Sequence, residues 1–123
     1  MSDFLFKNLT VWQKALVFAD KIIEICENLN SDYKHYKLIE QTEAASSSIA
    51  QNIAEGSGRH SKKEFIQFIY YSRGSLYETI TLLNLFEKRN WITNQKLEEC
   101  EQNGIELGKM LNGLINSLSK AIE

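Results

Sequence analysis

The segment from Gln51 to Phe65 constrains the fold of this chain more than any other segment. Gly56 and Gly58 interrupt a helical pattern, and we expect Gly56 to end the helix in the left-handed conformation that glycine adopts readily. Ser61, followed three residues later by Glu64, forms the capping-box pattern that begins a helix. One helix that ends and another that begins within so few residues predict an antiparallel helix pair.

Apolar residues recur at spacings of three and four along most of the chain, and the sequence contains no proline. A second capping-box pattern, Thr10 with Gln13, marks the start of the first helix. The spacing predicts helices over about residues 11–29, 36–55, 62–88 and 94–121. The expected fold is all-α: an antiparallel up-down-up-down four-helix bundle that forms a single domain over residues 1–123.

The amino-acid composition and net charge of the chain limit the classes of function to which it can belong. The chain is 43% hydrophobic and 24% charged, which is typical of a soluble globular protein, and no apolar run is long enough to cross a membrane. Sixteen acidic and 14 basic residues give a net charge of −2, a poor match to a dedicated nucleic-acid binder. Cys26 and Cys100 fall on helical patterns and lack metal-ligand spacing, so we expect reduced, buried thiols in a cytoplasmic protein.

The sequence gives little support for catalysis. The stretch from Ala44 to Ala50 contains only alanine, serine and one isoleucine, which predicts close packing of a neighbouring helix rather than a nucleophilic serine. His35 and His60 lie in predicted loops, where solvent exposure is the default. No set of nucleophile, base and anion hole can be assembled. We therefore expect a non-enzymatic protein with no cofactor, no metal and no small-molecule substrate.

The first candidate site is the turn itself. Its cationic side chains, at the start of a helix, could contact an anion or a nucleic-acid backbone: Arg59, His60, Lys62 and Lys63. The alternative, which we favour, is a capping turn with solvated lysines and Arg59 paired to Glu55. Asn52 and Glu55, a polar pair near Arg59, could bind a ligand, but we favour a structural network that orients the turn.

The second candidate site is a subunit interface. The apolar arcs of the first and third helices are wider than one bundle core requires, and the extra strips supply five candidate contacts: Phe18, Tyr70, Arg73, Tyr77 and Ile80. The alternative is that the chain's own helices cover the arc. Gly74 lies in the middle of the third helix, where either the helix yields or another backbone comes close. We favour the interface.

The chain resembles the family of proteins encoded within intervening sequences of bacterial 23S rRNA genes. The resemblance spans most of the chain and rests on three groups of residues: Phe6, Leu9 and Val11-Trp12-Gln13-Lys14-Ala15; Asn52-Ile53-Ala54-Glu55-Gly56, Gly58-Arg59, Ser61 and Lys63-Glu64-Phe65; and Phe68, Tyr70, Gly74-Ser75-Leu76 and Glu78.

That resemblance implies a four-helix bundle that assembles as a homopentamer, with a binding or scaffold role associated with rRNA or ribosomes. The resemblance extends to a related group, the accessory proteins of diversity-generating retroelements, which bind nucleic acid and a reverse transcriptase. RNA or DNA is therefore an alternative partner. The chain departs from the family at three positions. Glu43 and Ala44 stand where the family commonly has two arginines, and Ala50 stands where it has a proline. Two lost cations remove two potential phosphate contacts.

Overall fold

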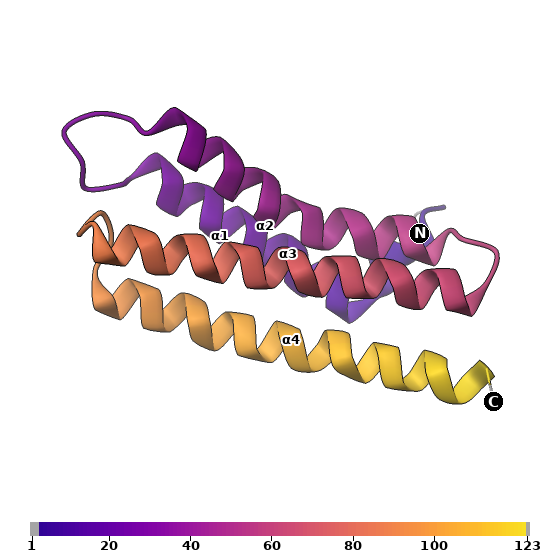
Figure 1. Ribbon diagram of the computed structural model, residues 1–123. Helices are drawn as coiled ribbons and strands as arrows, with labels where there is room; N and C mark the ends of the chain where they lie inside the picture. The colour runs from indigo at the N-terminus through magenta and orange to yellow at the C-terminus, as the bar shows by residue number, and fades with distance from the viewer. Residues whose placement is uncertain (1–2, 123) are drawn as a thin grey trace.

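The computed structural model describes residues 3–122. A short 3-10 helix, Leu5–Asn8, precedes α1 (Thr10–Glu27), α2 (Tyr36–Ser57), α3 (Lys62–Lys88) and α4 (Asn94–Ile122). The four long helices alternate in direction along one another, and both chain ends lie toward the same end of the bundle (Figure 1). The expected all-α four-helix bundle is confirmed.

The packing is uneven around the bundle. Helix α2 packs most extensively on α3, α1 on α2 and α4 on α3, whereas α1 and α4 touch only sparsely. One hydrophobic core runs between the helices. Its largest fully buried apolar side chains are Phe86, Ile22, Ile49, Ile53, Ile69, Leu76, Leu83 and Leu111. The seam between α1 and α4 is therefore the open side of the bundle.

Small side chains bring α2 and α3 together, as the serine-rich stretch predicts. Ser72 Oγ donates a buried hydrogen bond to the Ile49 carbonyl oxygen at 2.8 Å. Ser75 Oγ donates to Ser48 Oγ at 2.9 Å. These bonds join one helix directly to the next, so a shift of α2 along α3 would break both of them.

The expectation that Gly56 ends α2 in the left-handed conformation is wrong. Helix α2 continues through Gly56 to Ser57, and no described glycine has a positive φ. Glycine is needed there for space: a Cβ on Gly56 would lie 2.6 Å from Phe68 Cβ and 3.3 Å from the Phe65 carbonyl oxygen. The helix ends at Ser57, and Gly58 is its C-cap, whose N–H donates to the Glu55 carbonyl oxygen.

The two predicted N-terminal caps have different outcomes. Ser61 Oγ accepts the Glu64 N–H at 3.1 Å, which confirms the cap of α3. Thr10 is wrong as a cap, since α1 begins at Thr10 itself and its N-cap, Leu9, makes no side-chain cap bond. Gln13 instead donates from Nε2 to the Lys7 carbonyl oxygen at 2.7 Å, so it holds the 3-10 helix against the start of α1.

The turn between α3 and α4 is a Schellman motif with Asn90 in the left-handed conformation, at φ 62°. The Trp91 N–H donates to the Phe86 carbonyl oxygen, and the Asn90 N–H donates to the Glu87 carbonyl oxygen, both at 2.9 Å. Thr93 Oγ1 then accepts the Lys96 N–H at 3.1 Å and caps the first turn of α4. The motif turns Trp91 inward, where it packs against Phe86 with 5.4 Å between ring centroids.

Candidate subunit interface on α3 and α4

An exposed aromatic face runs along α3. Tyr70 is 41% exposed and Tyr77 is 58% exposed, although both lie next to buried core positions of the same helix. The half-buried Arg73 lies between them, with its guanidinium carbon 4.7 Å from the Tyr70 ring centroid and 5.9 Å from that of Tyr77. The two rings and the cation form one surface, because each ring face attracts the guanidinium.

Arg73 also links this face to α4. Its Nη1 donates to Asn112 Oδ1 at 3.0 Å. The guanidinium is thus fixed by one hydrogen bond and two ring contacts. Among the described residues, Arg73 forms no ion pair with a carboxylate. An arginine that is oriented in this way is ready to donate to a group outside the chain.

A groove of about 530 Å³ continues the face across the helix pair. Its walls are Leu76, Tyr77 and Ile80 on α3 and Gly104, Ile105 and Gly108 on α4. Gly104 is required by close packing within the chain, since a Cβ there would lie 3.1 Å from Ile80 Cδ1. Ile105, at the rim, is 51% exposed. The groove is therefore mostly apolar and aromatic, and Glu101, Lys109 and Asn112 of α4 supply its polar lining.

Four of the five predicted interface residues belong to this face or its groove: Tyr70, Arg73, Tyr77 and Ile80. Phe18 does not. It is 4% exposed and lies in the hydrophobic core of its own chain, so the expectation that it contacts another subunit is wrong. The second apolar strip of α1, Val11, Phe18 and Ile25, is buried within the chain. Sequence reasoning missed Ile105 and Asn112, although an apolar residue among polar neighbours on α4 was a usable signal.

The structure brings the predicted turn residues together only in part. Arg59 Nη2 donates to Glu55 Oε1 at 2.8 Å and its guanidinium carbon lies 4.6 Å from the Phe68 ring centroid, so the predicted pairing with Glu55 is present. Asn52 belongs elsewhere: its Nδ2 donates to Ser48 Oγ and to the Ser48 carbonyl oxygen, both at 2.9 Å. The expected network of Asn52 with Glu55 is therefore wrong.

The other basic residues of the turn, His60, Lys62 and Lys63, are exposed and take part in no ion pair among residues 3–122. His35 differs from the expectation of a solvent-exposed histidine, since it is half-buried against Trp91. In the described part of the chain, no group of three or more His, Cys, Asp or Glu side chains is placed to hold a metal ion. No described helix is long and apolar enough to cross a membrane.

The thiols of Cys26 and Cys100 are both free and buried. Burial, with smaller contributions from Glu43 and Glu27, raises the pKa of Cys26 to about 12. Burial also raises the pKa of Cys100, against the opposing charges of Lys21 and Lys96. Because the thiolate is the reactive form, neither sulfur is prepared for nucleophilic chemistry.

The fold and its exposed face define an all-helical bundle protein. Comparison with known families then identifies it: the model of the 23S rRNA-intervening sequence protein family matches residues 7–113, and the chain belongs to that family. Solved structures agree. A crystal structure of a protein of unknown function from the S23 ribosomal protein family of Bacteroides thetaiotaomicron VPI-5482 is 26% identical, with a TM-score of 0.80. The match covers 86% of this chain and 98% of that one. No curated protein matches.

Proposed function

We propose that this chain is a non-enzymatic, homo-oligomeric scaffold or binding protein, and that its exposed α3 face is the contact between subunits. The observation that carries the proposal is the exposure of Tyr70 and Tyr77 around Arg73. Tyrosine and arginine are enriched at the centres of protein interfaces, where each supplies a large contact area and a polar group. The adjoining groove offers apolar walls into which a neighbouring subunit can insert side chains.

Gly74 supports the same reading. Helix α3 runs through it without interruption, and a Cβ at Gly74 would meet nothing within 4 Å. Glycine in an exposed helix costs about 1 kcal/mol relative to alanine, and no contact within the chain explains that cost. Gly74 lies between Tyr70 and Tyr77 in sequence, so a backbone of a second subunit that approaches there would explain it.

The number of subunits that we propose, five, and the association with rRNA or ribosomes rest on family membership and on the resemblance described above. The neighbouring crystal structure is described as belonging to a ribosomal protein family and as having unknown function. A cytoplasmic location accords with such a role.

Light scattering after gel filtration at micromolar concentration tests the assembly. A pentamer of this 14.2 kDa chain has a mass of about 71 kDa, five times the mass of one chain. Tyr77→Glu should shift the mass toward that of a monomer, because a buried unpaired carboxylate is costly. Tyr36→Glu is the matched control, since Tyr36 is 73% exposed and lies on α2, away from this face. A wild-type mass near 14.2 kDa would remove the proposal.

A second candidate function is nucleic-acid binding at the α2–α3 turn, as in the retroelement accessory proteins. It is favoured by the exposed Lys62 and Lys63 near Arg59, which stacks on Phe68, and by Tyr71, whose ring lies 5.5 Å from Phe68. Cations beside exposed rings suit single-stranded nucleic acid. Labelled RNA should then bind with salt-dependent affinity, and Lys62→Ala or Arg59→Ala should flatten that dependence by about one phosphate contact. Lys37→Ala, on α2, should not. Absence of binding at low salt would exclude this function.

A further inference from the structure

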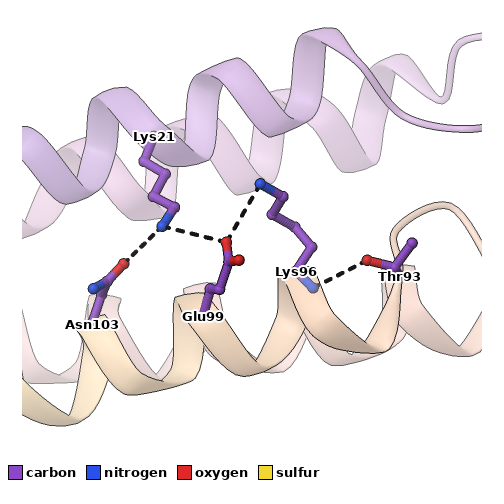
Figure 2. A network of polar contacts seen from close by, with 5 residues as sticks. All are labelled: Lys21, Thr93, Lys96, Glu99 and Asn103. Atoms are coloured by element: carbon purple, nitrogen blue, oxygen red, sulfur yellow. Dashed lines mark hydrogen bonds and ion pairs between the residues drawn. The ribbon is translucent and has the colours of Figure 1, made fainter.

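The seam between α1 and α4 is bridged by polar side chains rather than filled by apolar ones. Lys21 Nζ lies 3.1 Å from Asn103 Oδ1 and 3.9 Å from Glu99 Oε2, so it reaches from α1 across to α4 (Figure 2). Lys14 and Glu106 make a second bridge at 3.6 Å, nearer the other end of the seam. These contacts hold the two antiparallel helices beside each other but leave the space between them incompletely filled.

A groove of about 980 Å³ opens at the end of the seam where α1 ends and α4 begins. Its apolar residues are Val17 and Ile25 on α1 and Trp91 and Ile92 in the turn before α4. Val17 is 69% exposed, whereas Trp91 is only 8% exposed and forms part of the core. The groove thus has an apolar floor that includes a buried tryptophan, and an exposed apolar rim at Val17. Its uncharged polar lining residues are Asn28, Asn30, Asn90, Thr93 and Asn94.

The free charge of the groove is negative. Asp20 and Glu24 on α1 and Glu87 near the end of α3 line it, and none of the three forms an ion pair among the described residues. Its two lysines, Lys21 and Lys96, both lie close to one carboxylate oxygen of Glu99, at 3.9 Å and 3.5 Å (Figure 2). One carboxylate offsets only one of the two lysine charges. With Asp20, Glu24 and Glu87 the groove still has two more carboxylates than lysines, and these three carboxylates remain for a partner.

We infer that this groove docks a cationic amphipathic helix of a partner protein. The apolar floor would receive the apolar stripe of that helix, and Asp20, Glu24 and Glu87 would pair with lysines or arginines on its flanks. The α1 wall extends from Val17 to Asn28, which is about 16 Å at 1.5 Å per residue, or roughly three turns of a docked helix.

A helix fits the groove better than an extended peptide does. The groove is lined by helices and by the turns that flank them, and none of these is an extended strand, so it offers no strand edge for an extended backbone. A helix satisfies its own backbone hydrogen bonds and needs only side-chain contacts. A second copy of this chain is a poorer match, because it carries a net charge of −2. Of its basic residues in 59–63, Arg59 and His60 lie in a turn, and Lys62 and Lys63 occupy only the first turn of α3.

A designed peptide tests the inference. The probe is a fluorescein-labelled peptide of about 18 residues, made of leucine and lysine with the leucines on one helical stripe, titrated with the full chain and followed by anisotropy. We expect micromolar affinity that weakens as salt rises from about 50 mM to about 300 mM. The variant Asp20→Asn, Glu24→Gln, Glu87→Gln should bind roughly tenfold more weakly, because three charge pairs are lost.

A control variant with the same change in net charge tests whether the groove itself determines the affinity for the peptide. Glu40→Gln, Glu78→Gln and Glu98→Gln also remove three exposed, unpaired carboxylates, from other parts of the surface, and this triple variant should bind like the wild-type chain. Val17→Lys, which places a cation on the exposed rim, should weaken binding as well. All the substituted positions except the half-buried Glu87 are exposed, and circular dichroism of each variant should show the helical spectrum of the wild-type chain.

Three results would overturn the inference. The first is absence of binding at low salt. The second is an equal loss of affinity in the two triple variants, which would mean attraction to net charge alone. The third is equal binding of a scrambled peptide that lacks the stripe.

If the peptide fails to bind while the groove variant changes the mass of the assembly in light scattering, the groove is a contact between subunits and the inference is wrong. None of these results depends on whether the α3 face forms the proposed interface.

Discussion

His35 stacks on Trp91, with 3.8 Å between the ring centroids and an angle of 22° between the ring planes. Ser31 Oγ donates to the Tyr33 carbonyl oxygen, so the same hydroxyl accepts a hydrogen bond from His35 Nε2 at 3.0 Å. The Asn30 N–H also donates to the Trp91 carbonyl oxygen. The loop between α1 and α2 is thereby fastened to the turn between α3 and α4.

This contact should stabilise the end of the bundle. His35→Ala should lower the free energy of unfolding by about 1 kcal/mol, and a double-mutant cycle with Trp91→Phe should give a coupling of about 0.5–1.5 kcal/mol. Urea denaturation measures both values. His60→Ala is the control, because His60 is exposed in the α2–α3 turn and its loss should cost less than about 0.5 kcal/mol. Equal effects of the two histidine substitutions would contradict a structural role for the stack.

Gly56 should not tolerate alanine. The added Cβ would lie 2.6 Å from Phe68 Cβ, which is bonded directly to the backbone and cannot rotate away. Gly56→Ala should therefore destabilise the protein by about 1–3 kcal/mol, despite the higher helix propensity of alanine. Gly113→Ala, where a Cβ meets nothing within 4 Å, should instead stabilise it by up to about 1 kcal/mol. Thermal and urea unfolding of the two variants should move in opposite directions.

Ser61 should contribute to stability through its cap. Ser61→Ala leaves the Glu64 N–H without its Oγ acceptor and should cost about 1 kcal/mol. Ser61→Asp should restore most of that loss, because a carboxylate also accepts the bond and interacts favourably with the helix N-terminus. If alanine and aspartate gave the same unfolding midpoint, the hydroxyl would not be acting as a cap.

The buried thiols should be unreactive in the folded protein. Because burial raises the pKa of Cys26 to about 12, almost no thiolate exists at pH 8, and Ellman's reagent should label Cys26 and Cys100 only as the chain unfolds. Rapid labelling of the native protein at the rate of a free thiol would show that one of the sulfurs is accessible.

The same shift predicts an alkaline loss of stability. The pKa of Cys26 in the folded state lies above its ordinary value of 9.0, so the unfolded chain loses the thiol proton first as pH rises. The contribution of Cys26 is intact below about pH 9 and falls by up to about 1.4 kcal/mol per pH unit as pH rises toward 12. The free energy of unfolding of Cys26→Ala, measured over this range, should fall less steeply than that of the wild-type chain.

Local signals determined where the helices lie. The predicted range 62–88 equals α3, and 36–55 differs from α2 by two residues, because spacing and caps act within a few residues of one another. The end of α1 was placed two residues too late, since Asn28 ends the helix at Glu27. The exposed Tyr70 and Tyr77 were also foreseeable, because the apolar arc of α3 is wider than a single core needs.

Tertiary packing decided what these residues contact. Phe18 is buried in the hydrophobic core of its own chain, and Gly56 is a glycine because Phe68 approaches it from α3. The stack of His35 on Trp91 joins residues 56 positions apart in the sequence, and the acidic groove combines α1, α3 and α4. Helix periodicity gives the direction of each side chain around its own axis, but the rotation and spacing of neighbouring helices depend on how all their side chains fit together.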